Sequence, residues 1–140
     1  MKRLSLLSLA AAAALFVGQP LAAFATPDIG KPAPSFTGTD SRGKTIALDD
    51  LRGKTVVLEW TNHDCPYVRK HYSAGNMQTL QREAAKDGVV WLQVISSAPG
   101  LEGHLSGDAA EALNNDRKAV PAGIVLDPKG EIGRRYAARH

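Results

Sequence analysis

Two short runs of apolar residues dominate the hydrophobic pattern of the chain. "TVVLEW", residues 55–60, and "VVWLQVI", residues 89–95, have the length and β-branched composition of strands that are buried within a sheet. The segment between them is long enough to form a helix, and a strand–helix–strand unit of this kind joins its strands in parallel through a right-handed crossover. The pattern therefore predicts a parallel sheet with a helix packed against it.

The segment between the two strands predicts a helix from Pro66 toward Ala85, interrupted at Gly75 and Asn76. Proline suits the first turn of a helix because its missing N–H would have no partner there, whereas glycine inside a helix favours a break or kink. Gly88 is expected to close the helix in a left-handed conformation. The expected buried stripe of this helix consists of Val68, Tyr72, Met77, Leu80 and Ala84.

Shorter elements are predicted on both sides of this unit. Three prolines indicate an extended arm at residues 26–36, and residues 39–54 predict a small hairpin or strand followed by one helical turn. Downstream we expect a loop at 96–107, a helix at about 108–118, a strand at 122–127, a turn at 127–130 and a last helix at 131–139. This order predicts a layered α/β fold with a two- or three-stranded parallel sheet, whose edges would be exposed.

The first 25 residues have the layout of a secretory signal peptide. "MKR" is a positively charged start, the next fourteen residues are uncharged and mostly apolar, and small residues at Ala23 and Ala25 favour cleavage after Ala25. The apolar run is shorter than the roughly 20 residues of a membrane-spanning helix. We therefore expect a mature domain of residues 26–140 that is periplasmic or secreted and has no membrane segment after cleavage.

The charge pattern excludes some classes of function. Cleavage would remove Lys2 and Arg3, so the formal net charge would fall from +3 to +1. Basic residues are not interleaved with aromatic residues, which argues against a nucleic-acid groove, and no nucleotide-binding fingerprint is present. No cofactor is expected.

Cys65 is the only cysteine of the chain. Oxidising compartments favour paired cysteines, so a single one is either buried and inert or a reactive thiol that pairs with another molecule. Its expected place at the start of a helix favours the thiolate, although Asp64 opposes this. Residues expected to support the thiolate or to line its pocket are Trp60, His63, Pro66, Tyr67, Arg69 and Lys70.

A metal site is a second possibility from the residues alone. His63, Cys65 and His71 form the pattern H-x-C-x5-H, whose soft and borderline ligands suit copper or zinc. His63 and Cys65 stand two residues apart at a strand-to-helix turn, however, and need not point the same way. A third possibility is a small apolar cysteine packed under the helix.

Several segments resemble the thioredoxin-like redoxin family, meaning the alkyl hydroperoxide reductase / thiol-specific antioxidant group and its exported relatives. "IGKPAPSF" is similar to that family's opening signature G-x-x-A-P-x-F, and "GKTIALDDLRGKTVVLEWTN" is similar to its next block. Cys65 falls where the family has its first active-site cysteine. "AVPAGIVLDPKGEIGRRYAAR" resembles the segment that precedes the family's cis-proline. Together these matches cover nearly all of residues 29–139.

Three departures from the family pattern bear on the chemistry. Val68 stands where a dithiol member has its resolving cysteine, and Leu58 and Asn62 stand where the peroxidatic pattern has proline and serine or threonine. The chain also ends before the cis-proline loop, the final antiparallel strand pair and the last helix. The resemblance therefore implies a thioredoxin-like three-layer α/β fold that is incomplete at its C-terminus.

These observations predict an exported thiol-dependent oxidoreductase with Cys65 as its redox-active cysteine. Attack on a disulfide would leave a mixed disulfide, and attack on a peroxide would leave a sulfenic acid, as in an antioxidant enzyme. Either product needs an external thiol reductant, and the expected partners are that reductant or a disulfide-bearing protein. The alternative is a non-enzymatic copper- or zinc-binding protein or a degenerate thioredoxin-like adaptor.

Overall fold

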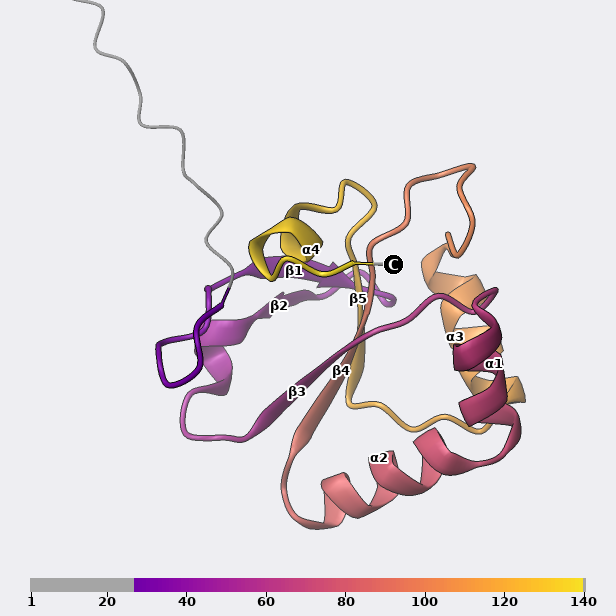
Figure 1. Cartoon of the computed structure of the whole chain (residues 1–140), viewed down its shortest axis with the longest axis horizontal. Helices are drawn as coiled ribbons and strands as arrows, with labels where there is room; N and C mark the ends of the chain where they lie inside the picture. Colours follow the sequence, from indigo (N-terminus) through magenta and orange to yellow (C-terminus); the bar gives the residue numbers. More distant parts are fainter. Residues whose placement is uncertain (1–26, 140) are drawn as a thin grey trace, which may run out of the picture.

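The computed structural model describes residues 27–139, so the expected signal peptide at residues 1–25 lies outside the described part. Five strands form one mixed sheet in the order β2-β1-β5-β4-β3 (Figure 1). The strands are β1 Thr37–Asp40, β2 Thr45–Ala47, β3 Val56–Trp60, β4 Val90–Ile95 and β5 Gly123–Leu126. The helices are the 3-10 turn η1 Leu48–Leu51, α1 Pro66–Ser73, α2 Asn76–Lys86, α3 Gly107–Asp116 and α4 Glu131–Arg135.

The central strand–helix–strand unit is confirmed. β3 pairs in parallel with β4, so that Leu58 lies opposite Leu92, and β4 pairs in parallel with β5. The connection from β3 to β4 runs through α1 and α2, which are separated at Gly75 as the sequence predicts. Gly75 has a φ of 76° and Gly88 a φ of 73°, values that glycine adopts without steric cost. The same glycines therefore end both helices.

The parallel part of the sheet has three strands, β3, β4 and β5, as the sequence predicts, but the sequence did not show that the predicted hairpin extends this sheet to five strands. The hairpin β1–β2 adds to the free edge of β5 in antiparallel pairing, with Thr39 opposite Leu126. The hairpin covers the backbone groups that β5 would otherwise expose. Pairing between residues so far apart in the chain leaves no local pattern in the sequence, which explains why the pairing of β1 with β5 was not predicted.

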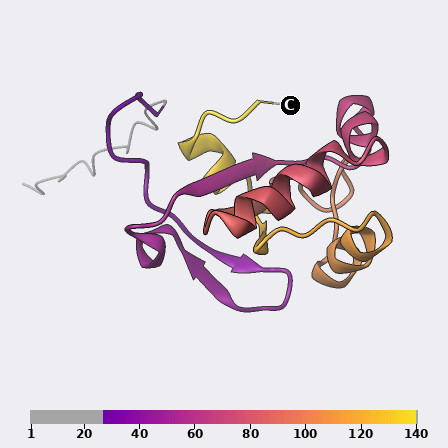
Figure 2. The same cartoon turned by 90° about the horizontal axis from the view of Figure 1, so that it is seen from below.

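Helices cover both faces of the sheet, which confirms the predicted three-layer α/β arrangement. One face carries the main apolar core, which α4 and η1 close with Ile132, Leu48 and Leu51. The opposite face is covered by α1, α2 and α3, and its apolar part is a smaller cluster around Ile95 and Ile124. Figure 2 shows α1 and α3 at one end of the molecule, beyond the carboxyl end of β3.

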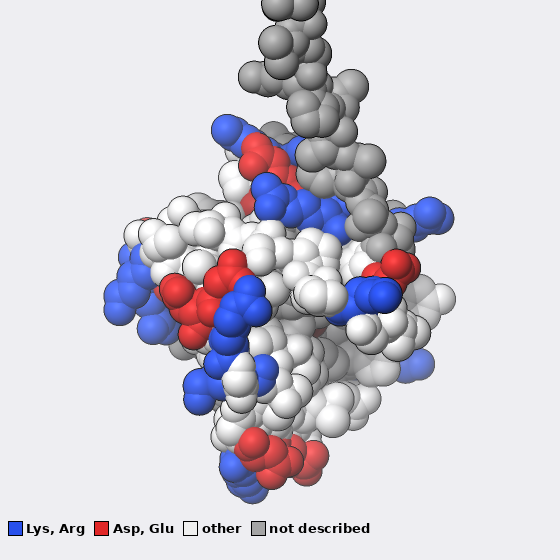
Figure 3. Space-filling model, turned by 90° about the vertical axis from the view of Figure 1, so that its left-hand side faces the viewer, with Lys and Arg blue, Asp and Glu red and all other residues white. Residues whose placement is uncertain are grey.

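The face that lies on the left-hand side of Figure 1 carries basic and acidic side chains next to one another (Figure 3). On this face the mixing gives no extended patch of one sign. None of the helices within residues 27–139 combines the length and the apolar character that a bilayer crossing demands.

Candidate functional site

Cys65 is the N-cap residue of α1 and follows β3 after a short turn. Its φ of −63° and ψ of 126° are extended, and Pro66 follows as the first helical residue. The Cys65 N–H donates to the Asn62 carbonyl over 3.1 Å, and its carbonyl accepts from the Arg69 N–H over 3.0 Å. The thiol is free and half-buried. It therefore lies where the unpaired N–H groups and the dipole of α1 favour an anion.

A pocket of about 310 Å³ opens beside Cys65. The turn that carries Cys65 forms one wall, and the loop after β4 forms another. Two contacts tie these walls together: Asn62 Nδ2 donates to Glu102 Oε1 over 3.2 Å, and the Gly103 N–H donates to Asp64 Oδ2 over 3.2 Å. The pocket is lined by Trp60, Thr61, Asn62, Cys65, Pro66, Val68, Ser96, Ser97, Glu102 and Arg139.

The Trp60 wall of this pocket is held by a chain of hydrogen bonds that ends at α4. Trp60 Nε1 donates to Ser96 Oγ over 3.1 Å, and Ser96 Oγ donates to Asp127 Oδ2 over 2.6 Å. The buried Asp127 carboxylate also accepts the N–H groups of Glu131 and Gly133 at the start of α4. The start of α4 therefore fixes the Asp127 carboxylate, and this carboxylate orients the Ser96 hydroxyl. The hydroxyl in turn holds the Trp60 indole in the wall of the Cys65 pocket.

The residues expected to support the thiolate have different surroundings. Trp60 and Pro66 line the pocket with Cys65, whereas Tyr67 is 75% exposed and lies outside it. Arg69 and Lys70 are exposed on α1. His63 is half-buried, with its Nε2 3.5 Å from Asp64 Oδ2.

The metal alternative gains no support from the geometry. Across residues 27–139, no three His, Cys, Asp or Glu side chains are grouped closely enough to hold an ion. His71 is exposed on α1, where its Nδ1 lies 3.2 Å from Asn76 Nδ2. His63, Cys65 and His71 are therefore not brought together as ligands.

A buried hydrogen-bond network lies between the sheet and α1–α3, with the Tyr72 hydroxyl at its centre. Tyr72 donates to Glu59 Oε1 over 2.8 Å. It accepts from Gln81 Nε2 at 3.1 Å and from Gln93 Nε2 at 2.5 Å. Glu59 Oε2 accepts in turn from Trp91 Nε1 at 2.7 Å. Burial raises the pKa of Tyr72 far above its ordinary value, and the nearby charge of Glu59 raises it further, so the hydroxyl remains a donor.

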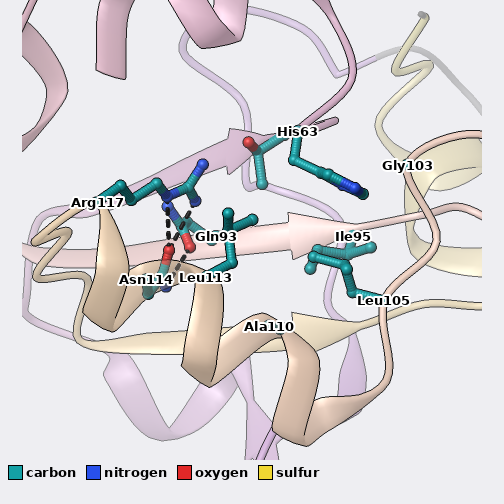
Figure 4. A pocket seen from close by; sticks show the side chains of 10 residues that line it. His63, Gln93, Ile95, Gly103, Leu105, Ala110, Leu113, Asn114 and Arg117 are labelled. Carbon is teal, nitrogen blue, oxygen red and sulfur yellow. Dashed lines mark hydrogen bonds between the residues drawn. The ribbon is translucent and has the colours of Figure 1, made fainter. Parts of the chain in front are cut away.

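The network continues from the sheet to α3 and returns to Tyr72. Gln93 Oε1 accepts from Asn114 Nδ2 over 2.8 Å, and Asn114 Oδ1 accepts from Arg117 Nε and Nη2 at 2.9 and 2.7 Å (Figure 4). The Arg117 guanidinium lies 3.6 Å above the centre of the Tyr72 ring. Burial lowers the pKa of Arg117, while Tyr72 and Glu59 oppose the shift. These contacts fix α1, the helix that Cys65 caps, against β3, β4 and α3.

Sequence reasoning missed this network and misjudged the buried side of α2. Leu80, expected in the buried stripe, is 48% exposed, whereas Gln81 is fully buried and Gln78 is 7% exposed. The physical reason is the polar centre of the facing sheet surface, where Glu59 and Gln93 need hydrogen-bond partners. The signal available in the sequence was the pair of polar residues inside otherwise apolar strands.

A small cavity of about 10 Å³ lies beside this network, between α3 and the ends of β3 and β4. Figure 4 shows Arg117 and Asn114 on one side of it and the His63 ring on the other, near Gly103. Within the described residues, Thr61 Oγ1 and His63 Nδ1 are buried atoms without a hydrogen-bond partner. Both residues line this cavity.

Comparison with known proteins shows consistent similarities. The model of the AhpC/TSA family matches residues 29–140. A thiol peroxidase of Mycobacterium tuberculosis is 32% identical over 105 residues, which are 75% of this chain and 58% of that protein. The chain thus spans less than two thirds of the length of the curated relatives that it matches.

Solved structures share the fold. A proposed protein disulfide isomerase of Bacteroides thetaiotaomicron superposes with a TM-score of 0.60 at 26% identity. The superposition covers 79% of this chain and 65% of the isomerase chain. A proposed thiol:disulfide interchange protein, DsbE, of Chlorobium tepidum superposes with a TM-score of 0.61 at 25% identity. The superposition covers 80% of this chain and 72% of the DsbE chain. The fold is therefore thioredoxin-like.

Proposed function

We propose, from the premise that the chain belongs to the AhpC/TSA family, that it is a thiol-dependent oxidoreductase whose reactive group is Cys65. The observation that carries the proposal is the position of this thiol. It caps the start of α1 and opens into a pocket of about 310 Å³. A thiolate at a helix start, next to a space that admits a second reactant, has the environment of a redox cysteine.

The chemistry uses one cysteine and an external reductant. Attack of the Cys65 thiolate on a disulfide forms a mixed disulfide and releases one thiolate. Attack on a peroxide leaves a sulfenic acid and releases an alcohol or water. An outside thiol then restores Cys65, because Val68 stands where a second cysteine would serve. Disulfide-bearing proteins and peroxides are the candidate substrates.

Export completes the proposal. Residues 1–25 have the charge, apolar run and small residues of a cleavable signal, and residues 26–140 would form the working domain. Expression of the full chain in a bacterium should yield a periplasmic protein whose first residue is Thr26. Recovery of the uncleaved chain from the cytoplasm, measured by intact mass, would contradict export.

Alkylation tests the reactivity of Cys65. At about pH 6 an ordinary cysteine, which titrates near 8.5, is almost entirely protonated. We expect iodoacetamide to modify Cys65 at least about tenfold faster than the cysteine of a blocked peptide at that pH, because the start of α1 favours the thiolate. Mass spectrometry follows the modification, and Cys65→Ser is the blank.

An alkylation rate at or below that of the peptide would refute the proposal. Mass spectrometry of the modified protein then distinguishes a peroxide substrate from a disulfide substrate. Treatment with hydrogen peroxide followed by dimedone should trap a sulfenic acid on Cys65 if peroxides are substrates. A disulfide substrate gives a mixed disulfide instead.

A further inference from the structure

A groove of about 490 Å³ runs between α1 and α3, separate from the pocket beside Cys65. Val68, Arg69 and Tyr72 line it from α1, and Leu113 and Arg117 line it from the α3 side. Val68 also lines the Cys65 pocket. The side chain that stands where a dithiol member has its second cysteine is therefore the boundary between the two spaces.

The groove follows the face of α1 that begins at Cys65. Residues three, four and seven positions after Cys65 share its face of the helix, and these are Val68, Arg69 and Tyr72. With a rise of about 1.5 Å per residue, Arg69 lies about 6 Å and Tyr72 about 10 Å along the helix axis from Cys65. A small molecule whose sulfur reaches Cys65 can thus extend into the groove.

The groove has an excess of positive charge. Across residues 27–139, neither Arg69 nor Arg117 has a carboxylate within ion-pair distance. Arg117 is half-buried, and its Nε and Nη2 are bound only to the neutral amide of Asn114. Figure 4 shows its guanidinium beside Asn114, joined to it by hydrogen bonds. A partly buried cation with a neutral partner is a site that an anion stabilises.

The acidic groups nearby are already engaged. Glu59 accepts hydrogen bonds from Tyr72 and Trp91. Asp64 lines the groove, but its Oδ2 accepts the Gly103 N–H and lies 3.5 Å from His63 Nε2. The two arginines therefore keep unused N–H donors.

We propose that this groove binds the carboxylate of the external low-molecular-weight thiol that regenerates Cys65. The inference rests on the proposed function and names the class of its reductant. The groove volume lies within the range of small-molecule sites, which favours a small thiol over a protein. Guanidinium groups pair with carboxylates by charge-assisted hydrogen bonds.

The bound thiol would act in two balanced steps. Its sulfur attacks the Cys65 sulfenic acid, forming a disulfide to Cys65 and releasing water. A second thiolate then attacks that disulfide, which frees the Cys65 thiolate and leaves the oxidised, symmetric disulfide of the small thiol. When the substrate is a disulfide, the small thiolate attacks the substrate sulfur of the mixed disulfide, which frees the Cys65 thiolate and leaves the small thiol joined to the substrate by a disulfide. In the first step the carboxylate in the groove holds the attacking sulfur over Val68.

A matched pair of peptides tests the role of the carboxylate. Cys65 is first converted to its mixed disulfide with thionitrobenzoate. The acetylated and amidated peptides Cys-Gly-Glu and Cys-Gly-Gln are then added, and release of thionitrobenzoate is followed by absorbance. The thiol displaces this leaving group at the Cys65 sulfur. We expect the Glu peptide to react about three- to tenfold faster at low salt, and the ratio to approach one in about 1 M NaCl, where charges are screened beyond about 3 Å.

Variants locate the effect. Arg69→Gln and Arg117→Gln should each bring the Glu/Gln rate ratio toward one. Arg82→Gln removes the same charge from an exposed site on α2 and should leave the ratio unchanged. Arg69 is exposed, so its variant is expected to fold even if Arg117→Gln does not.

The outcomes separate this inference from the proposed function. Equal rates for the two peptides, or an equal fall of the ratio in Arg82→Gln, would overturn the groove as a carboxylate site. If instead Cys65 forms no adduct with the thionitrobenzoate reagent, the proposed function itself fails. Mercaptosuccinate against thioglycerol gives a second test, and the acidic thiol should react faster with the wild type only.

Discussion

Tyr72→Phe is expected to lower the free energy of unfolding by about 2–4 kcal/mol, because one hydroxyl serves three partners, the half-buried Glu59 and the buried Gln81 and Gln93. Without it, the Glu59 carboxylate loses a donor at 2.8 Å, and the amides of Gln81 and Gln93 lose an acceptor. The ring and its stacking with Arg117 remain, so little packing is lost. Urea unfolding at neutral pH, monitored by circular dichroism, measures the change.

Tyr67→Phe is the matched control. It removes the same hydroxyl from the same helix, but at a side chain that is 75% exposed, and it should change stability by less than about 0.5 kcal/mol. If Tyr72→Phe cost no more than Tyr67→Phe, the network would not hold α1 in place. If Tyr72→Phe is destabilised as expected, alkylation of Cys65 in the same samples shows whether a loosened α1 alters the thiol.

Gly107→Ala is expected to cost about 3 kcal/mol or more, because the new Cβ would meet backbone rather than a movable side chain. An ideal Cβ at Gly107 lies 2.1 Å from the carbonyl oxygen of Ser41. The same region joins α3 to the β1–β2 hairpin, where Ser41 Oγ and Arg42 both donate to Glu111. Relief of the clash therefore requires α3 or the hairpin to shift, with loss of these contacts. Thermal unfolding measures the effect.

Two variants separate the clash from other causes. Asp108→Ala, at the next and exposed position, should stay within about 0.5 kcal/mol of the wild type. Gly43→Ala has open space around its Cβ but a φ of 78°, so it should cost only about 1 kcal/mol from backbone strain. A cost for Gly107→Ala no larger than that of Gly43→Ala would contradict the close approach.

Much of the fold could be predicted because its signals are local. β-branched runs mark β3 and β4, Pro66 marks the start of α1, and Gly75 marks its separation from α2. The same local reasoning placed Cys65 at a helix start, since a strand ends just before it and a proline follows. Elements identified by neighbouring residues were therefore located within a few positions.

The remainder depends on contacts between distant residues. The pairing of β1 with β5 places residue 39 opposite residue 126. No pattern in either segment predicts that the other is its partner. Gln81 is fully buried because Glu59, on another element, needs a partner. The carboxylate groove likewise combines Arg69 with Arg117, which only the packing of α1 beside α3 brings together.

The position of β3 at the border of the sheet has a practical consequence for handling the protein. Among the described strands, β3 has β4 as its single neighbour, so its other side presents unpaired backbone groups along "VVLEW". Such a border is a template for strand addition between molecules. We expect concentration, freezing and storage to promote aggregation through this strand first, and light scattering detects the aggregates. Kinetic work on Cys65 therefore calls for freshly gel-filtered, dilute samples.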